Sequence, residues 1–361
     1  MKTTVKRWPY LLTGSIVFLC VGIVYAWSIF ASIFKTSFHS WTSTELATTF
    51  TIIMGLFCIG NLSAGFISRK LSARAMLLIC AALIGGGFMS VSLVQENTIW
   101  LLYLGYGAIG SFGVGLAYNT VLSTVTRWFP EKVGTASGTL MMSFAFSTLI
   151  LGIGVDALAQ VMSWRVVFAL VGVFIALVLA WSSSILKVPE RDAVLPQKAV
   201  MPGAEAVQTI DISVPEMLRS SAFWLFFVWG VLLLIPVYGL MGNVKQCVIE
   251  LDKTAVTIGT LSVTLLAVSN GIGRLLLGSL YDRVGRKKTM TIDTLLIIMS
   301  SAAMIAAFRT CSIPLTMLGV MLTGLAYGGL PPISSAFAVD FFGPSNYPMK
   351  FGIVSLTILV G

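Results

Sequence analysis

Long apolar stretches, separated by short polar turns, follow one another along the whole chain. Each complete stretch reaches or exceeds the roughly 20 residues that an α-helix needs to cross a bilayer. The pattern predicts ten such helices and an eleventh that begins near Tyr347. The ten predicted helices cover residues 10–34, 45–67, 75–94, 99–125, 133–157, 166–186, 222–245, 256–280, 289–308 and 313–338. We therefore expect an all-α membrane protein.

The composition agrees with a membrane protein and excludes several soluble classes. Hydrophobic residues make up 57% of the 361 residues and charged residues only 10%, with a mean hydropathy of +0.94. The formal net charge is +9, but the cations lie in short turns between apolar stretches, so no nucleic-acid partner is expected. The five cysteines show no paired spacing, which argues against a disulfide framework or a zinc site.

Lysine and arginine are distributed unevenly between the two predicted sides. If the N-terminus is inside, the outer turns hold five cations: Lys35, Arg165, Lys245, Lys253 and Arg309. The inner segments then hold 16: Lys2, Lys6, Arg7, Arg69, Lys70, Arg74, Arg127, Lys132, Lys187, Arg191, Lys198, Arg219, Arg283, Arg286, Lys287 and Lys288. Because cytoplasmic loops are enriched in these residues, this excess predicts a cytoplasmic N-terminus in a multi-pass plasma-membrane protein. The first apolar stretch is too long for a signal peptide and lacks a cleavage site, so we expect it to be retained.

The second half of the chain repeats the first at a constant offset of 213 residues. The matched pairs include Tyr25 with Tyr238, Gly60 with Gly273, Gly65 with Gly278, Gly115 with Gly328, and Phe129 with Phe342. Chance matching of glycines is the alternative, but tyrosine and turn positions match as well. Two six-helix halves joined by a polar linker are a plan of secondary transporters. The predicted organisation is an N-terminal half over residues 1–186, a cytoplasmic linker over 187–220 and a C-terminal half over 221–361.

The repeat also predicts where the last helix of the second half ends. At the same offset, the counterpart of residue 186 is residue 399, whereas this chain ends at Gly361. We therefore expect an incomplete helix 11 and no helix 12, as in a fragment or truncated product.

The turn after the eighth predicted helix carries the most specific motif. Its sequence, GSLYDRVGRKK at residues 278–288, resembles the signature loop of the major facilitator superfamily almost residue for residue. This resemblance covers the whole chain once the repeat is included, and it implies the major facilitator fold with two pseudo-symmetric halves. In such a loop Asp282 can accept hydrogen bonds from a facing helix N-terminus, while Arg283 and Arg286 anchor the inner surface.

The two halves carry opposite charges at matched positions. Arg69 stands at the position of Asp282, and Arg127 at that of Asp340. In the major facilitator fold, the signature loop of one half abuts the fourth and fifth helices of the other. The resemblance therefore implies two ion pairs between the halves, Arg69 with Asp340 and Asp282 with Arg127, that latch the inner side. Solvated loop charges that merely follow membrane topology are the alternative.

Other stretches resemble the oxalate/formate antiporter family and its monocarboxylate-transporter relatives. They are GIVYAWSIF at 22–30, GVGLAYNT at 113–120, RWFPEKVGTASG at 127–138, WRVVF at 164–168 and NGIGR at 270–274. This family moves small carboxylates, often exchanging one for another, and its helix 8 arginine binds the substrate carboxylate. The resemblance assigns that role to Arg274.

An arginine inside an apolar helix points to an anion site on physical grounds as well. Such residues are costly in a membrane and usually face the bundle interior along a substrate or ion path. A guanidinium can bind a carboxylate through two parallel hydrogen bonds. Asn270 lies one helical turn before Arg274 and can donate to the same anion. The alternative is that Arg274 extends to the lipid headgroups.

Four tyrosines lie on the helices that line the cavity in this fold, the first and fourth of each half. They are Tyr25, Tyr118, Tyr238 and Tyr327. Their hydroxyl groups can orient a carboxylate while the rings exclude water. Tyrosines of the membrane interface are the alternative.

Relatives that take dicarboxylates carry a deep lysine in helix 11, a few residues after an Asn-Tyr pair. This chain has Asn346 and Tyr347, but Val354 occupies the lysine position, and Lys350 lies closer to the cytoplasmic end. A single deep cation favours a monocarboxylate such as formate, lactate or pyruvate.

Proline positions and acidic positions bear on gating and coupling. Pro236 and the pair Pro331–Pro332 are expected to break helices 7 and 10 near the cavity. The single histidine lies in an outer turn, and Asp156 and Asp293 lie near predicted helix ends. Exchange or facilitated diffusion is therefore favoured over a proton relay.

No enzyme, cofactor or metal site is expected. The G-x-G-x-x-G match at 105–110 lies inside an apolar helix with no preceding strand, unlike a dinucleotide site. The prediction is a monomeric secondary active transporter that moves a small carboxylate by alternating access, as an exchanger or facilitator. The alternatives are a sugar or drug porter, in which Arg274 is structural, and a membrane carboxylate sensor that does not transport.

Overall fold

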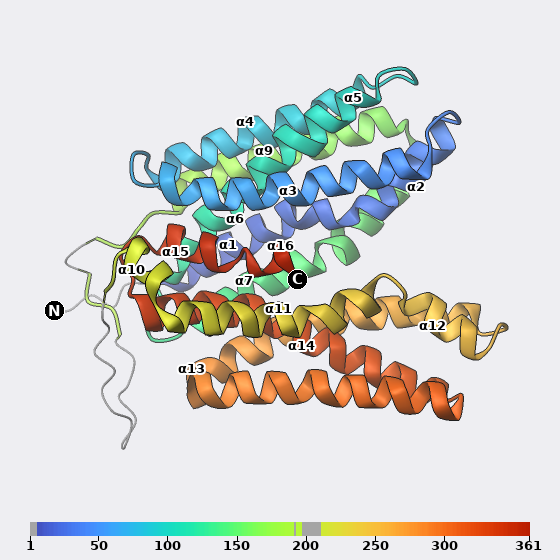
Figure 1. Cartoon of the computed structure of the whole chain (residues 1–361). Coiled ribbons are helices and arrows are strands. Elements are labelled where there is room, and N and C mark those ends of the chain that lie inside the picture. Colours follow the sequence, from blue (N-terminus) through green and yellow to red (C-terminus); the bar gives the residue numbers. More distant parts are fainter. Residues whose placement is uncertain (1–5, 191–192, 197–210) are drawn as a thin grey trace. The chain divides into compact units, whose positions relative to one another are not determined.

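The computed structural model describes residues 6–190, 193–196 and 211–361, so Lys2, Arg191, Lys198 and much of the predicted linker lie outside the described residues. Within these ranges the chain forms helices and no β-strand (Figure 1). Nine helical segments of the described chain are long and apolar enough to cross a membrane. The prediction of an all-α membrane protein is confirmed.

Three of the first six predicted helices change their winding along their length. The first comprises α1 (Trp8–Val21), the 3₁₀-helix η1 (Gly22–Ala26) and α2 (Trp27–Ser37). The fourth comprises α5 (Ile99–Leu102), the π-helix η2 (Tyr103–Gly110) and α6 (Ser111–Thr126). The fifth comprises α7 (Val133–Ser147), the π-helix η3 (Thr148–Gly152) and α8 (Ile153–Val161). The other three are α3 (Ser43–Ile67), α4 (Ala73–Ser92) and α9 (Trp164–Ile185).

The second half begins with a short helix inside the predicted linker. The elements in order are α10 (Val214–Arg219), α11 (Ser221–Met241), α12 (Val244–Leu251), α13 (Val256–Thr310), α14 (Ile313–Phe342), α15 (Tyr347–Val354) and α16 (Thr357–Val360). Polar side chains mark several starts. The Thr42 hydroxyl accepts from the Glu45 amide, and the Glu45 carboxylate accepts from the Thr42 amide, a capping box that begins α3.

Segment α13 contains helices 8 and 9, which meet at a kink inside the polar turn that the sequence predicted over residues 278–288. Only Gly285 departs from helical geometry, with φ 78° and ψ 171°. A glycine adopts this conformation without steric cost, so one residue is enough to change the direction of the chain. The predicted breaks at Pro236, Pro331 and Pro332 are wrong, because α11 and α14 run through them. A proline inside a helix removes one backbone hydrogen bond and crowds the carbonyl four residues earlier. Neighbouring helices and small local adjustments compensate this loss in membrane helices.

The chain divides into two compact units that each combine parts of both predicted halves. Unit 1 contains Met1–Pro130, Phe146–Pro196 and Asn346–Ile353. Unit 2 contains Glu131–Ala145, Gln197–Ser345 and Val354–Gly361. The first part of α7 therefore belongs with α13 and α14, and most of α15 belongs with α3 and α6.

Each unit has an aromatic component in its core. In unit 1, Phe30, Phe88, Tyr106 and Phe168 join α2, α4, η2 and α9, with ring centroids 4.7–6.5 Å apart. In unit 2, Phe226 of α11 stacks on Phe337 of α14 at 4.1 Å. These contacts bury large apolar side chains that hold the helices of each unit together.

The same glycine-mediated helix contact occurs once in each unit. A side chain at any of four glycines would overlap a carbonyl group of the facing helix. The contacts are Gly60 with the Phe112 carbonyl and Gly115 with the Phe57 carbonyl in unit 1, and Gly273 with the Leu325 carbonyl and Gly328 with the Asn270 carbonyl in unit 2. Each residue of the second set lies 213 positions after its counterpart. The sequence repeat is therefore also a repeat of packing, because small residues let helix backbones approach closely.

Candidate functional site

Arg274 is buried inside unit 2, with only 3% of its surface exposed. Its Nε donates to Asn270 Oδ1 at 3.2 Å, and its Nη1 donates to the Met141 carbonyl oxygen of α7 at 2.9 Å. A guanidinium has five N–H donors, and these two bonds are the only ones it makes with the described residues. Both acceptors are neutral, so neither bond compensates the positive charge.

Glycines bring two helices close to this arginine. Gly138 of α7 packs against the Arg274 carbonyl, and Gly328 of α14 packs against the backbone of Asn270 and Arg274. A larger side chain at either glycine would push its helix away. The Asn270 Nδ2 makes no bond with the described residues. The guanidinium and this amide therefore supply spare donors at one place, which is the donor set that binds a carboxylate.

Tyr238 and Tyr327 belong to the same unit as Arg274. Their ring centroids lie 6.1 Å apart in an edge-to-face arrangement. The Tyr238 hydroxyl donates to the Ile358 carbonyl at 2.9 Å, and Tyr327 directly precedes Gly328 on α14. The structure thus brings these two predicted residues together.

Tyr25 and Tyr118 belong to unit 1. Tyr118 is buried on α6, with its ring centroid 4.8 Å from Phe18 and 5.4 Å from Phe57. Tyr25 lies in the 3₁₀ segment η1. That these two tyrosines share a cavity with Arg274 stays a prediction, because they belong to the other unit.

Asp282 holds the first turn of α7. One carboxylate oxygen accepts from the Gly134 amide at 2.9 Å, and the other accepts from the Thr135 amide at 2.6 Å and the Thr135 hydroxyl at 2.7 Å. The amides at a helix N-terminus have no partner within the helix, and the helix dipole favours a negative charge there. The signature loop thus anchors α13 to the start of α7.

The two predicted ion pairs stay predictions, because the members of each pair belong to different units. Arg69 is exposed and its Nη2 lies 3.3 Å from the Met349 sulfur. Arg127 and Arg283 are exposed, and Asp340 is partly buried. Arg286 lies over the Phe341 ring, with Cζ 3.8 Å from the ring centroid. This cation–π contact fixes the α13 bend to the end of α14.

A buried polar cluster in unit 1 was not singled out from the sequence. The Asn119 amide of α6 donates to the carbonyls of Asn61 and Pro348, each at 2.8 Å. Lys350, in the first turn of α15, is fully buried. Lysine is rarely fully buried. Two features of the sequence could have pointed to this cluster. Asn119 lies in the family-like stretch GVGLAYNT, and Asn61 occupies the repeat position of Arg274.

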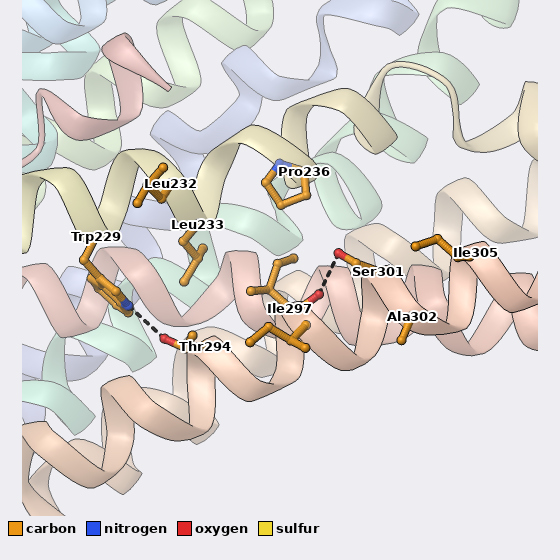
Figure 2. A pocket seen from close by; sticks show the side chains of 10 residues that line it. Trp229, Leu232, Leu233, Pro236, Thr294, Ile297, Ser301, Ala302 and Ile305 are labelled. Carbon is orange, nitrogen blue, oxygen red and sulfur yellow. Dashed lines mark hydrogen bonds between the residues drawn. The ribbon is translucent and has the colours of Figure 1, made fainter.

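An apolar cavity of about 510 Å³ lies between α11 and the second part of α13. Figure 2 shows its lining, in which Trp229 donates to Thr294 at 2.9 Å and Ser301 donates to the Ile297 carbonyl. Several lining side chains, such as Leu232 and Ile298, are more than half exposed on the outside of the unit. Because the lining has no charge and its polar hydrogens are engaged, this cavity does not suit a carboxylate.

Comparison with known proteins decides the family. The sequence profile described as Major Facilitator Superfamily matches residues 10–308 and 244–361. The chain belongs to the Major Facilitator Superfamily. It is therefore a multi-pass membrane protein of a transporter superfamily, as the signature loop indicated.

Two curated members of the superfamily align with nearly the whole chain. The uncharacterized MFS-type transporter YhjX of Escherichia coli is 23% identical over 98% of this chain and 85% of its own length. The oxalate:formate antiporter of Oxalobacter formigenes is 23% identical over 96% of this chain and 80% of its own length. The predicted resemblance to the oxalate/formate antiporter family is confirmed.

A solved structure supports the same fold. The proton:xylose symporter XylE matches 98% of this chain and 87% of its own chain with a TM-score of 0.68, at 15% sequence identity. At that identity the match establishes the major facilitator fold alone.

Proposed function

We propose that this superfamily member carries small carboxylate anions across the membrane by alternating access and that Arg274 binds the carboxylate. The observation that carries the proposal is the buried guanidinium, whose bonds to Asn270 and Met141 leave its charge uncompensated. Leaving a charge in a low-dielectric interior is costly unless a counter-ion arrives. A carboxylate supplies that counter-ion and two acceptors in the geometry of the guanidinium. A neutral sugar supplies neither charge nor this geometry.

The contacts between α7 and α13 also favour exchange. The two helices are joined at two levels, by Asp282 to the first turn of α7 and by Arg274 to the Met141 carbonyl. A bound carboxylate competes with the Met141 carbonyl for the guanidinium, and this competition weakens the attachment of α7 to α13 at Arg274. Without substrate the attachment remains, so the empty carrier reorients slowly. A carrier of this kind exchanges one anion for another faster than it moves anions in one direction.

Counterflow into proteoliposomes tests the proposal. Vesicles that contain the purified chain are loaded with unlabelled formate, lactate, pyruvate or oxalate, and uptake of the matching labelled acid is followed. We expect accumulation with at least one monocarboxylate and less with oxalate. Oxalate is included because Lys350 is a second buried cation. Protein-free vesicles are the control for passage of the neutral acids. If no small carboxylate shows counterflow, the proposal fails.

We infer that the N-terminus is cytoplasmic, on the strength of the excess of lysine and arginine in the segments of one side. The turn between α13 and α14 then faces outward, and it contains the exposed Cys311. A charged maleimide that cannot cross membranes is expected to label Cys311 in intact cells. Burial raises the pKa of Cys247, the other cysteine on that side, so its reaction is slower.

The assay uses a Cys247→Ser background and a Cys311→Ser control. Labelling of intact cells that disappears in the Cys311→Ser control supports the orientation. Labelling that requires permeabilised cells contradicts it.

A further inference from the structure

Asp293 is a fully buried carboxyl group for which the proposed carboxylate site has no use. It lies on α13, eight residues after Gly285, which is about 12 Å along the helix axis. Its side chain is 0% exposed, and neither carboxyl oxygen has a hydrogen-bond partner among the residues that the structure describes. The sequence placed this residue near a helix end, but the structure places it two turns inside the helix that continues from Gly285.

The surroundings of Asp293 are apolar. Gly329 of α14 faces the carboxyl group so closely that an added Cβ would lie 3.1 Å from both oxygens. The side chain of Leu277 covers Gly329 from the first part of α13, and buried Thr289 and Ile297 lie one turn away on the helix of Asp293. The carboxyl group is thus enclosed by α14 and both parts of α13.

No ionisable group of the packed helices compensates Asp293. Within the described residues, none has a hydrogen bond or an electrostatic interaction with its carboxyl group. The groups considered are Arg274, Tyr281, Asp282, Arg283, Arg286, Lys287 and Lys288 on α13, Tyr327 and Asp340 on α14, and Tyr238 on α11. An ionised carboxylate without donors or a counter-charge is very costly in such surroundings, whereas the neutral acid costs far less. Asp293 therefore holds a proton in this conformation.

One turn of α14 links this acid to the carboxylate site. Gly328 packs against the backbone at Asn270 and Arg274, and the next residue, Gly329, packs against the carboxyl group of Asp293. A shift of α14 relative to α13 therefore changes both contacts together. A shift that admits water to Asp293 lets its proton leave.

We infer that Asp293 is a proton-binding site of the transport cycle, neutral while α14 packs against it and deprotonated when that packing opens. The inference rests on the proposed transport of carboxylates and extends it, because a carrier with such a site moves a proton during net transport. During counterflow the carrier returns with substrate bound, so Asp293 can stay protonated. Net uptake requires the empty carrier to return and therefore requires release of the proton.

Replacement of Asp293 by asparagine separates these two modes. Asparagine resembles the protonated acid in shape and cannot release a proton. In proteoliposomes with acid outside, net uptake by the wild-type chain is expected to rise several-fold over uptake without a gradient. We expect Asp293→Asn to keep counterflow and to lose this response, while Asp156→Asn, which alters an exposed acid on α8, keeps both. Protein-free vesicles measure the leak of neutral acid.

Chemical labelling provides a second measurement that does not depend on transport. Dicyclohexylcarbodiimide, which is apolar, reacts with protonated carboxyl groups in apolar surroundings. We expect mass spectrometry to find the adduct on the Asp293 peptide of the wild-type chain at acidic pH, with less adduct as pH rises and none on Asp156.

Two results would overturn the inference: an unlabelled Asp293 at acidic pH, or an Asp293→Asn variant that responds to the gradient like the wild-type chain. These results can be distinguished from failure of the proposed function. If the chain does not transport carboxylates, counterflow is absent in the wild-type chain itself.

Discussion

Replacement of Arg274 by lysine is expected to lower kcat/KM for carboxylate exchange by about 10- to 100-fold. Lysine keeps the positive charge but presents a single compact donor group in place of the planar guanidinium. It cannot bond Asn270 while offering two parallel donors to a carboxylate. The loss of one or two hydrogen bonds to a charged group corresponds to about 1.4–2.8 kcal/mol. Initial rates of counterflow at several substrate concentrations measure the effect.

The matched control is Arg309→Lys, which makes the same substitution at an exposed position in the last turn of the second part of α13. We expect this control to transport at the wild-type rate. Equal activity of Arg274→Lys and the wild-type chain would show that a positive charge alone is needed at position 274, and the two-pronged grip on the substrate would have to be abandoned.

Replacement of Asp282 by alanine is expected to lower the free energy of unfolding by about 2 kcal/mol. The variant loses three hydrogen bonds from Gly134 and Thr135, two of them with backbone amides at the start of α7. Loss of a helix cap usually costs about 0.5–2 kcal/mol, and bonds to a charged acceptor lie at or above that range. Thermal unfolding of the detergent-solubilised chain measures the change.

Asp252 offers a control because its carboxylate accepts similar hydrogen bonds, but only from a residue of the same loop. Its carboxylate accepts from the amide and hydroxyl of Thr254, only two residues away in an exposed loop. Asp252→Ala therefore removes a local turn contact and leaves the helices joined, so we expect little change in melting temperature. If Asp282→Ala melts at the wild-type temperature too, the signature loop does not hold α7 in the way described.

The membrane fold could be predicted from the sequence because the length of an apolar stretch alone indicates whether it crosses a bilayer. The offset of 213 residues also identified glycines that the structure shows in matching helix contacts, such as Gly60 and Gly273. Single-residue geometry could not be predicted in the same way. The exact position of the bend, at Gly285, and the continuation of α14 through Pro331 depend on local geometry that a pattern of apolar residues does not describe.

In the candidate site, too, the residue types could be predicted from the sequence, whereas their partners on other helices could not. Arg274 stood out because a charge within an apolar helix is unusual, and Asn270 followed from helical spacing. The Met141 carbonyl as a partner could not be foreseen, because any residue has a carbonyl and only the approach of α7 selects this one. Asp293 was visible in the sequence, but its enclosure by Gly329 depends on how two helices meet.

The most direct test of the central claim, that Arg274 binds the substrate carboxylate, is the melting temperature of the purified chain with and without monocarboxylates at matched ionic strength. A ligand that binds the folded state at about 100 times its Kd stabilises it by about 2.7 kcal/mol. The account predicts a higher melting temperature for the wild-type chain with its substrate and a clearly smaller increase for a folded Arg274→Lys variant at the same concentration. An increase of equal size in the variant, or no increase with any carboxylate in the wild-type chain, would contradict it.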